Sequence, residues 1–287
     1  ASGRVRHRAV PERRQRAAGG FYSDMLDHCI YATDLPYGCK EAAVVRRCQA
    51  VKAFIRSFIM FVKQILKDSM LAAVCAAVVL TASFIRFGIP AAEIFLCGYF
   101  EKEVILKDYY LLFDLLLALV TPYMLCFASA MTMLTEYDEN ITSYLAVTPV
   151  GKKGYALSRL VFPALISFIV SILLMMWFSL TEWPFGTILL VCALTSLASL
   201  TVALFLFSFS HNRVEGLAMG KLAGLLMLGL PVPFFMQSGV QYLFSPLPSF
   251  WIAKLSLEQN AVFLLLAVLS SLFWIWPLYR RFSRKIA

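Results

Sequence analysis

The sequence has little of the charge that a soluble protein of its length carries. Charged residues make up only 15% of the 287 residues, whereas hydrophobic residues make up 60%. The mean hydropathy of +0.75 lies outside the usual range of soluble domains. Water therefore cannot be the solvent for most of this chain, and the composition excludes an ordinary soluble domain.

Signatures of catalysis and nucleotide binding are also missing. The run from Gly151 to Gly154 (GKKG) lacks the earlier glycine and the hydroxyl residue of a phosphate-binding loop. The sequence contains no H-E-x-x-H, no G-x-S-x-G and no aspartate cluster suited to a metal-dependent lipid transferase. His7, His28 and His211 all lie outside the long apolar runs. We therefore expect no catalytic residue, no metal site and no cofactor in this chain.

Cysteine pairing is not indicated either. The 7 cysteines are an odd number and form no C-x-x-C pair. The set His28, Cys29, Cys39 and Cys48 matches no zinc-ligand spacing. Free thiols are therefore favoured over a disulfide framework or a zinc site.

Long apolar runs are what the sequence has in abundance. A helix needs about 20 apolar residues to cross the hydrocarbon of a bilayer. Runs of this kind lie at about residues 69–87, 109–134, 158–180, 185–209, 216–236 and 261–278. We expect Gly88 and Pro90 to end the first run. The sequence thus predicts an all-α fold, a polytopic membrane protein with about six transmembrane helices.

The net charge is +9, and many of the basic residues lie beside these apolar runs. Basic residues beside them cluster in alternate loops. One set is Lys63, Lys67, Lys152, Lys153, Arg159, Arg213, Lys221, Arg280, Arg281, Arg284 and Lys285, and the other is Arg86, Lys102, Lys107 and Lys254. Cytoplasmic loops carry the excess of Lys and Arg, so we expect both termini in the cytoplasm. The basic excess therefore indicates topology and contact with anionic lipids, not nucleic acid.

Residues 1–50 differ from the rest of the chain because they are basic and have no sustained apolar periodicity. No apolar stretch follows their arginines, as a secretory signal peptide would require. Two interpretations remain open. The segment is either a disordered basic arm on the cytoplasmic face or a non-native extension before a natural start at Val51. The transmembrane domain is expected at residues 51–287.

An amphipathic helix is predicted from Val51 to Lys67. Its basic residues, Lys52, Arg56, Lys63 and Lys67, are spaced by 4, 7 and 4 residues and so share one helical face. Apolar residues fill the opposite face. This pattern is typical of a helix that lies in the membrane interface with its basic face towards lipid phosphates.

Asp114 is the one acid placed inside an apolar run. An ionisable residue in such a place is costly, and it suggests a functional role such as a substrate pathway. We favour the simpler interpretation that this carboxylate lies close enough to the outer interface to reach water or Arg86. Substitution by Asn would separate the two.

The run at 216–236 opens with Gly216, Gly220 and Gly224, two overlapping G-x-x-x-G patterns on one helical face. Small residues at this spacing let two helix backbones approach closely. The pattern predicts a helix-packing contact, either within the chain or between subunits.

The loop after the second run has the most distinctive composition. Its notable residues are Glu136, Asp138, Glu139, Tyr144, Thr148, Pro149, Lys152, Lys153, Tyr155 and Arg159. An acidic cluster, a short helix, a Thr-Pro break and a basic return into the next run form a compact elbow. Such an elbow is suited to contact with another protein.

On the residues of this elbow, together with Asn212 to Gly216 and Lys221, the sequence resembles a known family. It is similar to permease subunits of bacterial ATP-binding cassette exporters of the type-2 class, including fluoroquinolone and antimicrobial-peptide exporters. The resemblance covers about Val51 to Lys285.

The resemblance implies a permease that moves a hydrophobic or amphipathic substrate outward with ATP hydrolysed by a separate cassette ATPase. ATP and Mg²⁺ would bind to that partner and not to this chain. The elbow would transmit the ATPase movement, and two permeases would pair, as a homodimer or with a second permease subunit. Two alternatives stay open: a membrane-embedded enzyme, and a peptide-binding immunity or sensor protein without transport.

Overall fold

The computed structural model describes residues 59–60, 62–63, 65, 67–101, 104–139, 141, 151–236 and 238–285, with side chains left out at 151–153. The basic stretch 1–50 and the interfacial-helix residues Lys52 and Arg56 lie outside these ranges. Within them every secondary-structure element is helical.

The elements in chain order are α3 (Ser69–Ser83), η1 (Phe84–Gly88), α4 (Ile89–Phe100), η2 (Lys107–Tyr109), α5 (Tyr110–Asp138), α7 (Gly151–Ala156), η3 (Leu157–Val161), α8 (Phe162–Phe178), α9 (Phe185–Phe209), α10 (Arg213–Ala223), η4 (Gly224–Met227), α11 (Val232–Phe235), η5 (Gly239–Phe244), α12 (Pro248–Glu258) and α13 (Ala261–Lys285). Five helical stretches in the described part of the chain are long and apolar enough to cross a membrane: Ser69–Phe100, Lys107–Asp138, Gly154–Phe178, Phe185–Phe209 and Ala261–Lys285. The prediction of an all-α, multi-pass membrane protein is confirmed.

We expected the first span to end at Gly88 and Pro90, and this prediction is wrong. The helix runs on for 32 residues, from Ser69 to Phe100. The five-residue π-helical turn η1 makes this possible, because the N–H of Ile89 donates to the carbonyl of Phe84. This wider turn places Pro90 in the first turn of α4, where a missing N–H costs little.

The run at 216–236 is not a single transmembrane helix, so the described part of the chain has five long spans where about six were expected. The chain breaks after α10 and η4, and only the short α11 follows. A Cβ on Gly229 would lie 2.8 Å from the backbone nitrogen of Phe250, so the turn packs directly on α12. Ser249 donates to the carbonyl of Leu226 at 2.6 Å. Broken helices are tolerated at membrane depth where protein groups satisfy the freed backbone in this way.

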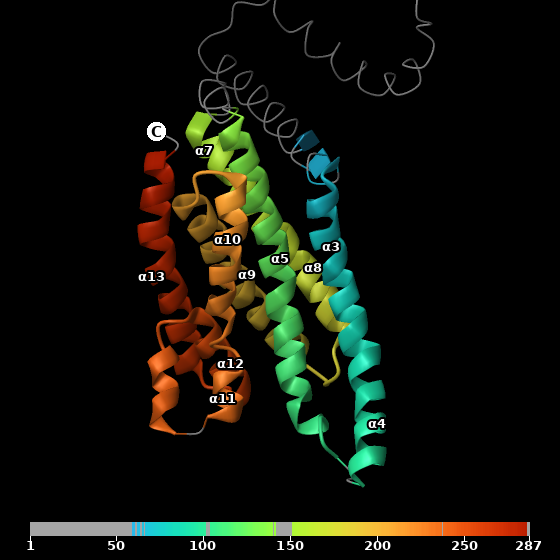
Figure 1. Cartoon of the computed structure of the whole chain (residues 1–287). Coiled ribbons are helices and arrows are strands. Elements are labelled where there is room, and N and C mark those ends of the chain that lie inside the picture. The colour runs from blue at the N-terminus through green and yellow to red at the C-terminus, as the bar shows by residue number, and fades with distance from the viewer. Residues whose placement is uncertain are drawn as a thin grey trace, which may run out of the picture. The chain divides into compact units, whose positions relative to one another are not determined.

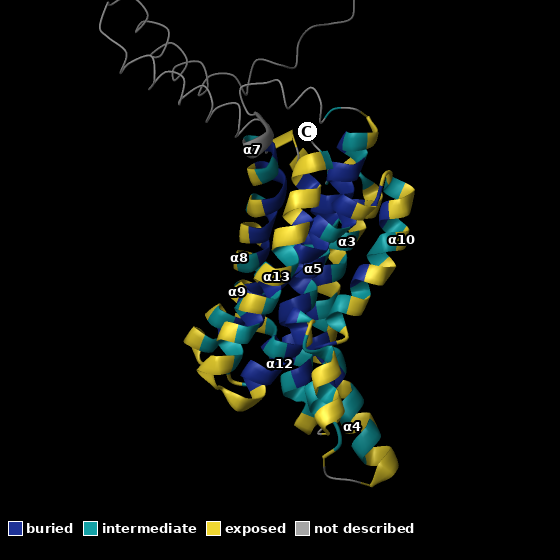
Figure 2. Cartoon of the chain, turned by 90° about the vertical axis from the view of Figure 1, so that its left-hand side faces the viewer, coloured by how far each residue is buried: buried dark blue, intermediate teal, exposed yellow. Residues whose placement is uncertain are grey.

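Helices α5 and α9 form the centre of the bundle. About two thirds of their apolar windows are buried, compared with 17% for α13. The pair contacts α3, α8, α10, α12 and α13 around it. Figure 2 shows this contrast, with buried residues on α5 and many exposed residues on α13. In lipid, such a centre is held by van der Waals packing and hydrogen bonds, because lipid is as apolar as the side chains.

Several helix ends lie together at one end of the bundle. Figure 1 shows the start of α3, the last turns of α5, helix α7 and the C-terminal end of α13 at this end. The described elbow residues, at the end of α5 and in α7, therefore lie at the same end of the bundle as the ends of α3 and α13.

Candidate functional site

A buried ion pair joins the end of α5 to the start of α8. The guanidinium of Arg159 donates from Nη2 to Oε1 of Glu136 at 2.6 Å and from Nε to both carboxylate oxygens at 3.1 Å. Each side chain is only 3% exposed. Arg159 lies in the π-helical turn η3, its carbonyl accepts the hydroxyl of Ser129, and its guanidinium lies 5.8 Å from the ring centroid of Tyr155. Two elbow residues 23 positions apart thus fix the central helix α5 to η3 at the start of α8.

The burial of this pair defines what Glu136 can do. We expected Glu136 at the contact with another protein, but its carboxylate is enclosed and occupied by Arg159. Removing one partner of such a pair leaves an unpaired buried charge, which costs about 3–5 kcal/mol. Glu136 is therefore a link between α5 and α8, and any coupling role acts through that link.

A second polar contact ties α3 and α5 to the start of α10. Arg213 pairs with Asp68 at 2.5 Å, and its backbone N–H donates to Asp138 at 3.0 Å. Asp68 also caps α3, because it accepts the N–H of Met70 at 3.0 Å. Burial tends to raise the pKa of Asp68, but the hydrogen bonds and charge of Arg213 and the N–H of Met70 outweigh it and hold the pKa below its ordinary value.

The start of α10 is fixed by a reciprocal cap. The side chain of Asn212 accepts the N–H of Glu215 at 2.8 Å, and Glu215 accepts the N–H of His211 at 2.7 Å. This arrangement is similar to a capping box, which satisfies the N–H groups left open at a helix start. It explains why Asn212 to Gly216 is a distinctive sequence.

Cations from the end of α13 cap the end of α9. Lys285 donates to the carbonyl of Phe207 at 2.7 Å and to that of Ser210. Arg281 donates from Nε to the carbonyl of Ser208 at 3.2 Å. The last carbonyls of a helix have no partner in the helix and carry partial negative charge, so cations stabilise them.

Lys285 also lies 4.6 Å from the ring centroid of Tyr137 on α5, which connects these cations to the other contacts. Together the contacts form one end network, made up of Asp68, Glu136, Asp138, Arg159, Arg213, Arg281 and Lys285. It links the ends of α3, α5, α8, α9, α10 and α13. The sequence singled out three of these residues as elbow residues, and it missed Asp68, Arg213, Arg281 and Lys285 as linkers. The position of Asp68 directly before an apolar helix was a usable cap signal, whereas the other contacts depend on tertiary structure.

For the other predicted residues of the elbow and the interfacial helix, the structure gives exposure or burial, or does not describe the side chain. Glu139, Lys63 and Lys67 are exposed, and Tyr155 is buried. Lys152 and Lys153 belong to α7, but their side chains are not described. The remaining elbow residues, Tyr144, Thr148 and Pro149, lie outside the described ranges.

The glycine face of α10 lies against α5 of the same chain. A Cβ on Gly216 would lie 2.4 Å from Cδ1 of Leu134, and one on Gly220 would lie 2.6 Å from Cε2 of Phe127. Gly224 has more room, since its nearest neighbour is 4.0 Å away. At Gly216 and Gly220 a side chain on α10 would displace Leu134 or Phe127 of α5, so the close approach of the two helices favours glycine.

Asp114 is an anchor for the loop between α8 and α9. Its carboxylate is fully buried and accepts the N–H of Leu180 at 2.8 Å, the N–H of Thr181 at 2.9 Å and Nε1 of Trp183 at 2.9 Å. The hydroxyl of Thr181 is a further donor. Arg86 instead donates to the carbonyl of Ser179 at 2.6 Å. The charge of Asp114 is thus balanced by several hydrogen bonds and not by Arg86.

Metal binding has no support in the described residues, since no group of three or more His, Cys, Asp or Glu side chains is placed to hold an ion. The site consists of contacts that link helix ends.

Comparison with known families decides the class. Residues 61–279 match the family described as fluoroquinolones export permease protein Rv2686c-like. The chain belongs to this family. The result agrees with the resemblance to cassette exporter permeases that the elbow indicated.

Two curated relatives of this permease come from Mycobacterium tuberculosis. They are the fluoroquinolones export permease proteins MT2760 of strain CDC 1551 / Oshkosh and Rv2686c of strain ATCC 25618 / H37Rv. Each is 26% identical over 166 residues, which cover 55% of the permease and 66% of the relative. The match thus spans just under two thirds of each relative's length. No solved structure matches the permease.

Proposed function

We propose that this chain is the membrane-spanning subunit of an ATP-driven exporter whose ATPase is a separate protein. The end network carries this proposal. It joins the elbow between α5 and α8 to the ends of four further helices, so a partner that displaces the elbow would move the helices together. ATP and Mg²⁺ would bind to that partner.

The route of coupling follows from the contacts. Movement of α7 would reach η3 and then Arg159, whose bidentate bond to Glu136 passes it to α5. Movement of α5 would reach α10 through Asp138 and the N–H of Arg213, and α3 through the Asp68 ion pair. A shift of this kind works when two arrangements of the bundle contact the partner differently.

The substrate is proposed from two sources. The apolar spans favour a hydrophobic or amphipathic compound, and the named relatives are fluoroquinolone export permeases. A fluoroquinolone is therefore the first substrate to test. The functional unit would contain two permeases, as a homodimer or with a second permease, and the termini of this chain would lie in the cytoplasm.

Reconstitution with a cassette ATPase encoded beside the gene tests the function. We expect the permease to co-purify with this ATPase and to move a fluoroquinolone into inverted vesicles only when ATP is present. In a matched preparation, the phosphate-loop lysine of the ATPase is substituted. This ATPase should still bind the permease, but the fluoroquinolone should not be transported.

Failure to bind the co-encoded ATPase would contradict the proposal. Binding of a peptide without ATP-dependent movement would instead identify an immunity or sensor protein. Product formation by the permease alone would identify a membrane-embedded enzyme.

A further inference from the structure

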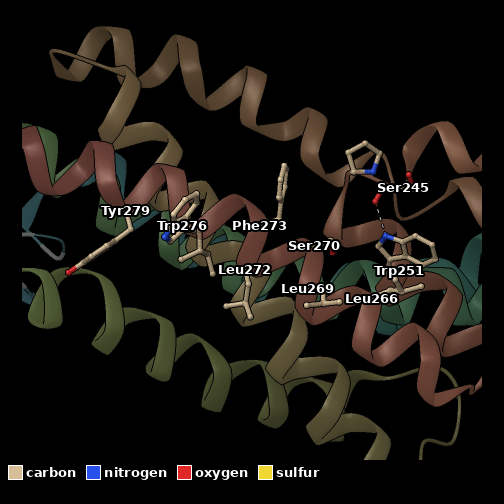
Figure 3. A pocket seen from close by; sticks show the side chains of 11 residues that line it. Ser245, Trp251, Leu266, Leu269, Ser270, Leu272, Phe273, Trp276 and Tyr279 are labelled. Atoms are coloured by element: carbon tan, nitrogen blue, oxygen red, sulfur yellow. Dashed lines mark hydrogen bonds between the residues drawn. The ribbon is translucent and has the colours of Figure 1, made fainter.

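One face of α13 combines an apolar groove with a basic end. The groove has a volume of about 950 Å³, and its walls include Leu269, Leu272, Phe273 and Trp276. Figure 3 shows these side chains in a row along α13, with Trp251 at the end far from Tyr279. The groove extends along α13 from Leu266 to Tyr279, a rise of about 20 Å, which is slightly more than one leaflet of a roughly 30 Å hydrocarbon layer.

A second cavity of about 330 Å³ adjoins the groove at Trp276. Its walls are Trp276, Pro277, Arg280, Arg281 and Arg284, so Trp276 lines both cavities. Residues 276, 280 and 284 follow each other at i, i+4 spacing and share one helical face with Leu269, Leu272 and Phe273. The same face therefore changes from apolar to cationic within two helical turns.

The arginines differ in what they contact. Arg281 donates to the carbonyl of Ser208 and lies 4.2 Å from the ring centroid of Phe209. The guanidinium of Arg280 lies 4.1 Å from the ring centroid of Trp276 at the junction of the two cavities. In the described part of the chain neither Arg280 nor Arg284 has an acidic partner, and no acid lines the basic cavity.

We propose that α13 carries a binding site for an anionic phospholipid. The acyl chains lie in the apolar groove, and the phosphate lies at Arg280 and Arg284. The indole of Trp276 separates the two parts, as tryptophan does at the boundary between hydrocarbon and headgroups. An occupant that spans both cavities must be both apolar and anionic, because Trp276 lines the apolar groove and the basic cavity alike. The inference rests on the membrane position of α13 and is independent of the proposed coupling to an ATPase.

A second copy of the chain fits this face poorly. A two-fold interface brings the same patch of both subunits together. Two chains inserted in the same sense would place Arg280 and Arg284 against their own counterparts, and like charges repel. An anionic lipid neutralises the same arginines, so charge complementarity favours the lipid.

Native mass spectrometry of the full chain tests the site, in mixed micelles that contain equal amounts of phosphatidylglycerol and phosphatidylcholine with the same acyl chains. We expect retention of phosphatidylglycerol in preference to phosphatidylcholine. The double variant Arg280→Gln/Arg284→Gln should lower this preference on the order of 30-fold, since each arginine near a surface contributes about fivefold. The control Lys107→Gln/Lys221→Gln removes two exposed cations elsewhere and should retain the preference.

Two further variants separate charge from shape. Arg280→Lys/Arg284→Lys keeps both charges and should retain most of the preference. Leu269→Trp fills the groove without changing charge and should lower retention of phosphatidylglycerol. Brominated phosphatidylglycerol should quench the tryptophan fluorescence of the parent protein more than that of the Trp276→Phe variant. This difference would place the lipid beside Trp276, at the junction of the cavities.

Several outcomes would overturn the site. Equal retention of both lipids would mean ordinary annular lipid, and an unchanged preference in the Gln double variant would remove the role of the arginines. Displacement of the lipid by inorganic phosphate alone would identify a free-anion site. A disulfide between Phe273→Cys residues of two copies would identify a subunit contact. None of these outcomes bears on ATP-dependent transport, so the site and the proposed function fail separately.

Discussion

At the scale of single residues, two buried carboxylates have different structural roles. Glu136 balances the charge of Arg159 and joins two helices, whereas Asp114 accepts hydrogen bonds from a loop and fixes its path. Both are acids inside a membrane domain, where an unpaired charge is costly. Their partners explain why each is tolerated, and they predict different responses to substitution.

Substitution of Glu136 should destabilise the bundle through Arg159. In Glu136→Gln the buried guanidinium keeps its charge without a counter-charge, so the free energy of unfolding should fall by about 3–5 kcal/mol. The double variant Glu136→Met/Arg159→Met should recover much of this loss. Unfolding in detergent monitored by circular dichroism measures both, and the exposed Glu139→Gln is the control.

Transport by the double variant then separates stability from coupling. If the ion pair transmits movement, Glu136→Met/Arg159→Met should fold well and transport poorly. Normal transport in a well-folded double variant would show that the pair serves stability alone.

Asp114→Asn should loosen the loop between α8 and α9. An amide offers one acceptor oxygen where the carboxylate offers two, so at least one loop N–H loses its partner, at a cost of about 1–3 kcal/mol. Stability should fall, while the folded fraction should still transport. Hydrogen exchange at Leu180 and Thr181 measures the effect, with exposed Asp108→Asn as the control. Loss of transport at unchanged stability would instead favour a place for Asp114 on the substrate pathway.

At the scale of helices, some boundaries could be predicted and others could not. The bounds of α9, Phe185 and Phe209, follow from one uninterrupted apolar run between Pro184 and Ser210. The continuation past Pro90 was missed because a π-helical turn absorbs the proline, and single-residue breaker rules do not include this device. The break near Gly229 was missed because it depends on contact with α12, a segment 20 residues further along.

The functional contacts show the same division. Glu136 and Arg159 could be singled out because charged residues beside apolar runs are conspicuous. Their pairing could not, because it depends on how α5 and α8 cross. The partners of Arg213 and Lys285 could not be predicted either, since they are a distant carboxylate and the end of another helix.

The contact of α10 with α5 yields a prediction at this scale. Gly220→Val should destabilise the bundle, because a Cβ there would lie 2.6 Å from the ring of Phe127. Overpacking of this kind costs about 1–3 kcal/mol. Gly98→Ala on α4 is the matched control, as it has no neighbour within 4 Å and should be neutral or slightly stabilising. Thermal unfolding in detergent compares the two, and equal melting temperatures would contradict the close contact.

At the scale of the whole membrane unit, the five spans and the broken α10–α11 segment predict a definite topology. Single cysteines at Val104 and Ser283, in a background without the 7 native cysteines, should lie on opposite sides of the membrane. A membrane-impermeant maleimide should label Val104→Cys in intact cells and Ser283→Cys only after permeabilisation. The reverse pattern would invert the proposed orientation, and equal labelling would contradict the spans.

The long helix from Ser69 to Phe100 also relates the protein to the thickness of its bilayer. Its 32 residues extend about 48 Å, whereas the hydrocarbon layer is about 30 Å thick. Immersing the whole helix would require a tilt of about 50°, beyond the roughly 0–40° range of transmembrane helices. Part of the helix must therefore extend into the headgroups or deform the bilayer, and Phe95 and Tyr99 are exposed on α4. This hydrophobic mismatch makes acyl-chain length a physical variable for the protein, and longer lipids should relieve it.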